Sequence, residues 1–308
     1  MKNDIKNLLS SIKTPVSGYI FKTYGGAYWG KDSYDNVVFG IISVEKATTI
    51  IESTKNLSLL MNVECEVITG KITRVEKLNI LVLKNADQID LFISLTTVFL
   101  MNISTYSFLQ FFLNLKELFS IEGKVDLLNL QGLYGELYCM YYFKKYLKTD
   151  ISKYYQTMSK MKFDFSISEH KKIEVKTTQK CERVHHFRNE QLNVLRYDIK
   201  IVSLLMQKDD KGLTLWDLID ECKNLFSNSL TTLLNIEKII RNYDESELKQ
   251  IGFNEKYLQD NLDFYDAIEV PRIFEKTNEG IYNIEFDSNL SKSKSLTNSE
   301  VITWISTN

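Results

Sequence analysis

Two short alternating runs on either side of a polar turn constrain the fold of this chain more than any other feature of its sequence. In the segment KFDFSISEHKKIEVKTT, residues 162–178, apolar and polar side chains alternate over 162–168 and again over 172–178. Alternation with a period of two is typical of strands, and the polar turn between the runs predicts a β-hairpin. Asp164 and Glu174 would then lie on paired strands.

The two acids and the lysine of this hairpin are expected to converge. Because side chains alternate across a strand, Glu174 and Lys176 should point to one face, while Ile173 and Val175 point into the core. Two carboxylates held close together repel each other, and a hard divalent cation bound through their oxygens relieves that repulsion. We therefore expect Asp164 and Glu174 to bind Mg²⁺, which Mn²⁺ can replace. Lys176 would orient a water or stabilise developing charge on a phosphodiester.

The length of the chain makes two or three structural units the expected organisation. At 308 residues it exceeds the size at which one hydrophobic core usually keeps growing. Hydrophobic residues make up 44% and charged residues 25%, which is typical of soluble globular proteins. The four cysteines include no CxxC pair, which argues against a zinc knuckle or a disulfide framework and fits a reducing cytoplasm. Charges interrupt the amino-terminal segment where a signal peptide would need an apolar stretch.

One long uncharged segment has to be weighed as a membrane span. From Leu91 to Leu115 the chain has no charged residue, and this length could cross a bilayer. Several polar side chains within it would need hydrogen-bond partners in lipid, namely Asn102, Ser104, Thr105, Ser107, Gln110 and Asn114. We therefore expect a buried strand followed by a core helix here, and no membrane partner.

Charge is distributed unevenly along the chain. The net charge of −2 predicts no general affinity for nucleic acid, because phosphate binding depends on clustered Lys and Arg. Between Tyr141 and Lys200, however, there are 14 Lys and Arg residues against 7 Asp and Glu, a local excess of +7. Two interpretations stay open at this point: a surface that binds nucleic acid, and an ordinary solvated surface rich in lysine.

Three regions of the chain differ in their patterning. Residues 1–118 contain alternating or apolar runs separated by polar turns, which predicts a β-rich amino-terminal domain. Residues 119–210 combine a mostly apolar helix with short strands, an α/β pattern that contains the hairpin. Residues 211–308 return to helical spacing and end in short strands, which predicts a helical carboxy-terminal extension.

The hairpin carries a motif that resembles a known signature. Asp164, nine intervening residues and then Glu174, Val175 and Lys176 are similar to the D-x(n)-(D/E)-x-K signature of the PD-(D/E)XK nuclease superfamily. Phe163 stands where the name of the superfamily has proline, which leaves the acids and the lysine intact. The order GLxGEL, KFDF, IEVKTT and RxHxFxxEQL also resembles uncharacterised PD-(D/E)XK proteins encoded among bacterial restriction and phage-defence genes.

Upstream of the hairpin, the phrase GLYGELY places Glu136 in a predicted helix. Members of the superfamily often carry a glutamate on this helix, so the resemblance implies that Glu136 is a third acid that completes the metal site or holds a metal-bound water. The alternative is a helix glutamate paired with a nearby lysine. We favour the first interpretation, because the neighbours of Glu136 are mostly apolar and a buried acid requires a partner.

Downstream of the hairpin, the phrase RVHHFRNEQL supplies further candidates. By the same resemblance, Arg183 or His185 could contact the scissile phosphate, and Gln191, on a following helix, could face the active centre. The alternatives are a surface arginine and a histidine at the end of a strand.

The resemblance implies an α/β fold with a restriction-endonuclease-like central mixed sheet flanked by helices. It also implies Mg²⁺-dependent hydrolysis of DNA phosphodiester bonds by a restriction or phage-defence enzyme of the type II restriction class. A homodimer would present two active sites to a duplex, and partner subunits of a defence system could join it. Two rivals remain: a catalytically inactive subunit that binds nucleic acid or serves assembly, and an RNase built on the same core. The intact set of two acids and a lysine weighs against the first.

Overall fold

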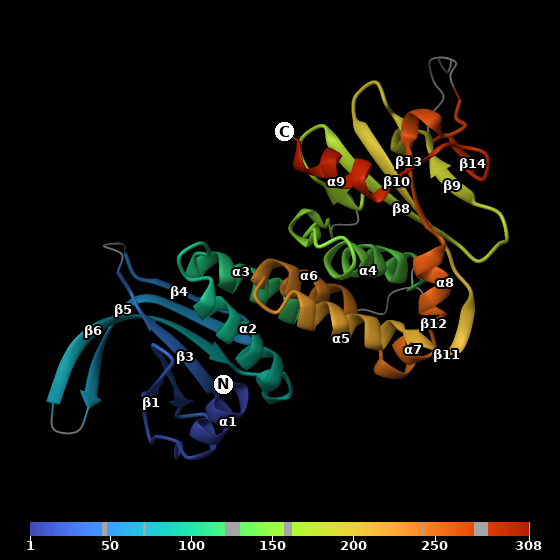
Figure 1. Ribbon diagram of the computed structural model, residues 1–308. Coiled ribbons are helices and arrows are strands. Elements are labelled where there is room, and N and C mark those ends of the chain that lie inside the picture. The colour runs from blue at the N-terminus through green and yellow to red at the C-terminus, as the bar shows by residue number, and fades with distance from the viewer. Residues whose placement is uncertain are drawn as a thin grey trace. The chain divides into compact units, whose positions relative to one another are not determined.

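The chain forms two compact units. The computed structural model (Figure 1) describes residues 1–44, 48–69, 72–120, 130–156, 162–241, 243–273 and 283–307. The first unit comprises Met1–Glu122 together with Asn228–Lys238, and the second comprises Gly123–Ser227 together with Ile239–Asn308. Each unit is built on a sheet of its own.

A six-stranded antiparallel sheet forms the base of the first unit. Its strands are β1 (Tyr19–Tyr24), β2 (Ala27–Asp32), β3 (Val37–Ile42), β4 (Ile50–Ser53), β5 (Leu57–Thr69) and β6 (Ile72–Leu83). They lie in the order β1-β2-β3-β6-β5-β4. Phe39, Leu81 and Leu59 face one another across β3, β6 and β5, and all three are buried. The amino-terminal region is therefore β-rich, as its alternating runs predicted.

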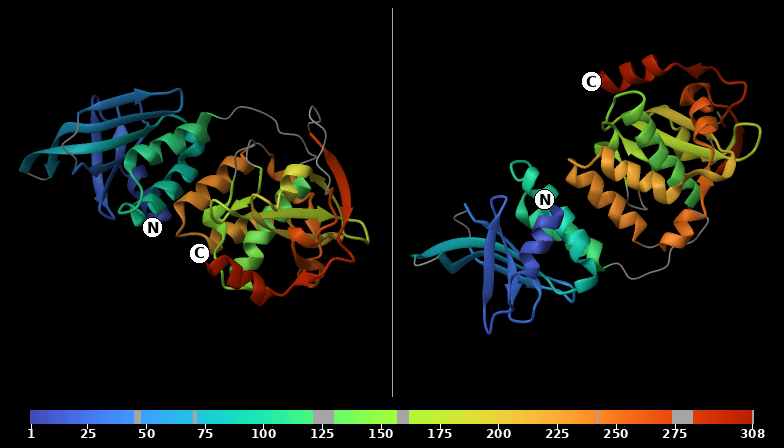
Figure 2. Two further views of the ribbon diagram at one scale, coloured as in Figure 1. Left: turned by 90° about the horizontal axis from the view of Figure 1, so that it is seen from above. Right: turned by 60° about the horizontal axis from the view of Figure 1, so that its bottom comes forward.

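Helices cover one face of this sheet. They are α1 (Lys2–Ser10), α2 (Ile89–Met101), α3 (Phe108–Ser120) and α6 (Leu230–Ile240), and Figure 2 shows α1 to α3 on the same side of the strands. Their apolar side chains join those of the strands in one core, in which the rings of Phe99 and Phe111 stack with centroids 4.5 Å apart. Leu230 and Leu233 place α6 in the same core, although α6 is distant in sequence.

The uncharged segment 91–115 forms parts of α2 and α3, so the expected buried strand is wrong and the expected core helix is present. Helix α2 is 13 residues long, mostly apolar and buried on several sides, which is too long for an ordinary strand and suits a helix inside a core. The helix ends where polar residues begin, and the Asn102 Nδ2 donates to the Val98 carbonyl at 2.8 Å. Within the described residues, no helix combines the length and the apolar character that crossing a bilayer requires.

The second unit has a five-stranded mixed sheet. Its strands are β7 (Phe165–Ser166), β8 (Lys171–Thr178), β10 (Asp198–Leu205), β13 (Leu262–Asp266) and β15 (Ser295–Leu296). They lie in the order β15-β13-β10-β8-β7. The pair β8 and β10 is parallel, and the other pairs are antiparallel. Together with the helices described next, this sheet confirms the expected α/β fold with a central mixed sheet.

Helix α4 (Leu130–Lys145) covers one face of the mixed sheet (Figure 1). The Phe143 ring lies 5.5 Å from the Phe264 ring of β13, edge to face. The approach is closest at Gly135, where an added Cβ would lie 2.2 Å from the Thr177 Cγ2 of β8. Helix α5 (Leu215–Leu225) packs on the outer side of α4, and its Cys222 thiol donates to the Leu137 carbonyl at 3.6 Å.

A two-stranded ribbon covers the opposite face of the mixed sheet. It consists of β9 (Val184–Arg188) and β14 (Glu285–Asn289), which pair antiparallel. Ile201 of β10 and Tyr265 of β13 pack there with Phe187 of β9 and Leu192. The remaining described elements of this unit include β11 (Lys208–Thr214), β12 (Gly252–Phe253), α7 (Glu245–Lys249) and α8 (Glu255–Asp260). The mixed sheet is thus buried on both faces.

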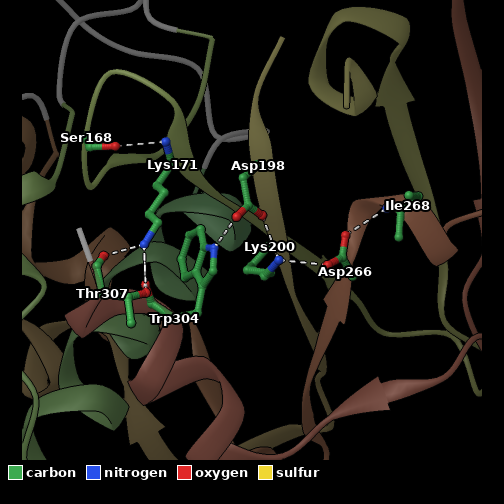
Figure 3. A network of polar contacts seen from close by, with 8 residues as sticks. All are labelled: Ser168, Lys171, Asp198, Lys200, Asp266, Ile268, Trp304 and Thr307. Atoms are coloured by element: carbon green, nitrogen blue, oxygen red, sulfur yellow. Dashed lines mark hydrogen bonds and ion pairs between the residues drawn. The ribbon is translucent and has the colours of Figure 1, made fainter. Parts of the chain in front are cut away.

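The last helix, α9 (Asn298–Ser306), is fixed to the sheet by a network of polar contacts (Figure 3). The buried Lys200 ammonium lies 2.7 Å from the carboxylates of both Asp198 and Asp266. The Trp304 indole N–H donates to the other Asp198 oxygen at 2.6 Å, and the Lys171 ammonium donates to the Trp304 carbonyl at 2.8 Å. A lysine at the last carbonyls of a helix is favourable both as a cap and against the helix dipole.

The two units do not coincide with the three regions expected from the patterning. The first unit ends at Glu122, close to the expected boundary at residue 118. Residues 211–308 are not a separate unit, because α6 joins the first core while α5, β13 and α9 complete the second. Pairing between strands that are distant in sequence, such as β10 and β13, cannot be detected from the local period of the apolar residues.

Two glycines of α4 offer a matched test of this packing. We expect Gly135→Ala to lower the free energy of unfolding by about 1–3 kcal/mol, because the new methyl would collide with the stiff, β-branched Thr177. Gly132 has nothing within 4 Å of an added Cβ, so Gly132→Ala should be neutral or stabilise by up to about 1 kcal/mol. Urea denaturation midpoints measure both, and adding Thr177→Ser should recover part of the Gly135→Ala loss. Equal midpoints for the two single variants would contradict the close approach.

Candidate active site

The hairpin expected from the alternating runs is present as β7 and β8. Phe165 pairs with Ile173 and Ser166 with Lys172, in antiparallel register. Asp164 directly precedes β7, where the two strands begin to separate. Its Oδ2 accepts a hydrogen bond of 2.7 Å from the Val175 backbone N–H. This bond turns the Asp164 carboxylate towards the middle of β8, where the other acid of the motif lies.

Glu174, Lys176 and Gln191 form a closed set of polar contacts on the ribbon side of β8. The Lys176 ammonium lies 2.9 Å from the Glu174 Oε1 and donates to the Gln191 Oε1 at 3.0 Å. The Gln191 amide nitrogen donates to the same Glu174 oxygen at 2.5 Å. Gln191 lies on the short 3₁₀ helix η4 (Asn189–Leu192), directly after β9. One side-chain amide therefore bridges the acid and the lysine.

Glu136 approaches this centre from the opposite layer. Gly135, its neighbour in α4, touches Val175 and Thr177, which alternate with Glu174 along β8. The Glu136 Oε2 accepts a hydrogen bond of 2.6 Å from the Tyr155 hydroxyl. Burial, then the negative charge of Asp164, and more weakly that of Glu174, raise the pKa of Glu136. The three carboxylates therefore interact across the thickness of the sheet.

All three carboxylates have pKa values above the usual range. Burial is the main cause for each: it raises the pKa of Asp164 and the pKa of Glu136, and it raises the pKa of Glu174 to about 8. This pKa of Glu174 also includes the effect of the Asp164 charge, which raises it, and of the Lys176 ammonium, which lowers it. The positive charge supplied by the protein does not compensate the three acids fully, which is the situation in which a bound cation stabilises carboxylates.

One buried oxygen indicates where such a cation would bind. The Glu174 Oε2 is buried and has no hydrogen-bond partner among the residues that the structure describes. A buried carboxyl oxygen without a partner costs free energy, and its ionised form would gain most from a hard cation, which the oxygen donors of the acids fit. Across the described ranges, however, no three His, Cys, Asp or Glu side chains stand ready as a preformed metal site. The metal roles of Asp164, Glu174 and Glu136 therefore stay predictions.

Comparison with known proteins decides the family. A family model described as "Putative PD-(D/E)XK family member, (DUF4420)" matches residues 26–291, which is most of the chain. The chain belongs to this family. Comparisons with curated proteins and with solved structures found no match. The resemblance inferred from the hairpin is thus confirmed at the level of the family.

In this PD-(D/E)XK family member, Arg183 is part of the interior and not of the expected phosphate-binding surface. Its Nη1 donates to the Ser203 carbonyl at 2.8 Å and to the Ser203 hydroxyl oxygen at 2.9 Å. Its Nη2 donates to the Asn261 carbonyl at 3.0 Å and lies 2.6 Å from an Asp263 carboxylate oxygen. The guanidinium is only 7% exposed and ties β9 to β10 and β13. The alternative, an arginine on the protein surface, does not hold either, because the side chain is buried.

His185 is also turned inward. Its Nε2 lies 2.7 Å from the Ser203 hydroxyl oxygen. Burial, and then the charges of Lys176 and Arg183, lower the pKa of His185 to about 4. The imidazole is therefore neutral at neutral pH and closed off from solvent. This placement favours a supporting role behind Lys176 over the expected contact with a phosphate.

Neither Tyr155 nor the outward-facing side of β9 was predicted from the sequence to belong to the site. Tyr155 lies outside the hairpin, in a segment with no distinctive pattern, and only its hydrogen bond to Glu136 marks it. The orientation of β9 was accessible from alternation, since Phe187 points into the core and Arg183 and His185 share its parity. Arg188, of opposite parity, points outward.

The bridging amide gives a test of this arrangement. We expect Gln191→Ala to lower the free energy of unfolding by about 1–3 kcal/mol, because Glu174 and Lys176 would each lose a partner in a poorly solvated place. Gln179 is exposed and bonds only to another glutamine side chain, so Gln179→Ala should change stability by less than about 0.5 kcal/mol. Chemical denaturation of both variants without divalent ions measures the difference. A Gln191→Ala midpoint at the wild-type value would show that the bridge does not form in solution.

Proposed function

We propose that this protein is a Mg²⁺-dependent endonuclease that hydrolyses phosphodiester bonds of DNA. The observation that carries the proposal is the buried Glu174 carboxylate, which Lys176 holds by one oxygen while the other has no partner in the described part of the chain. The hydrogen bond from the Val175 backbone N–H to Asp164 supports it, because it ties the second acid to the same strand. The family supports a nuclease of the PD-(D/E)XK type. We further propose a role in restriction or phage defence in the cytoplasm, as a homodimer with one active site per subunit and with partner subunits where the system has them.

The side chains of the site have distinct parts in the proposed reaction. Asp164 and Glu174 would hold the metal, with Glu136 as a third acid or as the acceptor of a water. The bound ion supplies Lewis-acid polarisation of a phosphodiester and a water of lowered pKa. The Lys176 ammonium, held in place by Glu174 and Gln191, can orient the attacking water or stabilise charge that develops on the phosphate. The Tyr155 hydroxyl fixes the orientation of Glu136.

The choice of DNA as substrate rests on the resemblance to restriction and defence proteins. The basic excess between Tyr141 and Lys200 supports a nucleic acid of either kind. An RNase on the same core, and an inactive subunit that only binds nucleic acid, are outcomes that the following experiment separates.

Plasmid nicking tests the proposed activity. With Mg²⁺ or Mn²⁺ present, we expect the wild-type chain to nick supercoiled DNA, and Asp164→Asn to reduce the rate at least roughly 100-fold by removing a metal-binding charge. Asp210→Asn makes the same chemical change at an exposed position on β11 and should leave the rate unchanged. Parallel reactions with an RNA of similar length identify an RNase. Binding without cleavage of either polymer would favour the inactive subunit.

Metal binding can be measured without any substrate. A ligand that binds only the folded state stabilises it by mass action, by about 2.7 kcal/mol at a concentration 100 times its dissociation constant. We therefore expect Mn²⁺ to raise the melting temperature of the wild type and of Asp210→Asn, and to leave that of Asp164→Asn unchanged. An equal rise in all three proteins would place the ion elsewhere.

A further inference from the structure

Arg188, the last residue of β9, presents its guanidinium to solvent next to the candidate active site. Its side chain is 74% exposed, and its Nε lies 3.1 Å from a Glu285 carboxylate oxygen of β14. Among the residues that the structure describes, Nε makes the hydrogen bond of this guanidinium, and neither Nη1 nor Nη2 donates one. The two outer nitrogens of the fork are therefore available to a ligand.

Hydrogen bonds through the Gln191 side chain connect the Arg188 backbone with the acid and the lysine of the motif. The Arg188 backbone N–H donates to the Gln191 Oε1 at 3.0 Å, and this oxygen also accepts from the Lys176 ammonium. The nitrogen of the same amide donates to Glu174. The charge of Arg188 is close enough to help lower the pKa of Glu174. Arg188 therefore adjoins the bridging amide of the site through its backbone, while its guanidinium lies in solvent beside Glu285.

We propose that the Arg188 guanidinium binds a backbone phosphate of the nucleic acid, adjacent to the phosphodiester that is cleaved. The proposal rests on the nuclease function proposed above and adds a substrate-binding residue to it. Arginine offers two parallel N–H donors to the oxygens of one phosphate, a geometry that fits phosphate better than a lysine ammonium does. The contact with Glu285 is exposed and therefore weak, so a phosphate can share or replace it.

Other cations near the site are less suited to this role. The guanidinium nitrogens of Arg183 already donate hydrogen bonds to Ser203 of β10 and to Asn261, directly before β13. Lys162 is exposed but lies 2.6 Å from a Glu190 carboxylate oxygen. The Arg196 guanidinium lies over the Tyr197 ring, with its centre 5.2 Å from the ring centroid. Arg196 nevertheless has the same charge as Arg188 and lies close to it in sequence, which makes it a matched control.

The test compares Arg188→Gln with Arg196→Gln in DNA binding and in cleavage. Binding is measured on a short duplex in EDTA, over a series of salt concentrations. We expect Arg188→Gln to weaken binding about tenfold, as for the loss of one charge-assisted hydrogen-bonded pair, and to reduce the slope of log K against log salt by about 0.9. Arg196→Gln should change affinity less than about twofold. Arg188→Lys keeps the charge without the fork and should fall between the wild type and Arg188→Gln.

A further variant separates phosphate binding from a loss of local structure. Glu285→Gln removes the carboxylate that competes for Arg188 and should tighten binding about twofold, which a merely structural role of the Arg188–Glu285 pair would not produce. Wild-type affinity and salt slope for Arg188→Gln, an equal loss for Arg196→Gln, or no DNA binding by the wild type would each overturn the proposal. If the wild type binds but does not nick, while Arg188→Gln binds more weakly, the proposed function fails and the phosphate contact stands.

Discussion

The burial of the Glu174 carboxylate is the constraint on which the rest of the second unit depends. Taking a charged carboxylate out of water is costly unless hydrogen bonds and opposite charge compensate it. Lys176 and Gln191 serve one of its oxygens, while the other has no partner in the part of the chain described. Hydrophobic side chains would fill this position at lower cost. The uncompensated buried oxygen therefore supports the proposal that a cation binds at this site.

The layers around the mixed sheet explain how acids on both of its sides affect one another's pKa. Val175 and Thr177 face α4, and Glu174 and Lys176 face the ribbon of β9 and β14. The absence of a side chain at Gly135 lets α4 lie close to β8, so that Glu136 senses the charges of Asp164 and Glu174 across the sheet. The same close packing that stabilises the core thus sets the distance between the acids.

Features with a local period could be predicted from the sequence, and features made by distant contacts could not. The hairpin and the common face of Glu174 and Lys176 follow from alternation, and the family resemblance located Gln191. Alternation could have placed Arg183 on the inner side, but it could not have named its partners. Ser203, Asn261 and Asp263 are brought together by the fold from β10, the turn before β13 and β13. Residues 211–308 are divided between the two units because β13 pairs with β10 in the second unit, while α6 packs in the core of the first.

The charge count of the basic segment also has to be interpreted through the fold. Many of its cations are occupied: Lys200 lies between two aspartates, Lys171 binds the carbonyls at the end of α9, and Arg183 is paired with Asp263. Strand parity then decides which cations remain for a substrate. In β9 the odd positions contact the core and the even positions face solvent, so Arg183 contributes to stability and Arg188 to the surface. The positive charge available to a phosphate near the acids therefore depends on which side chains of β9 face solvent. It does not depend on the total number of basic residues in the segment.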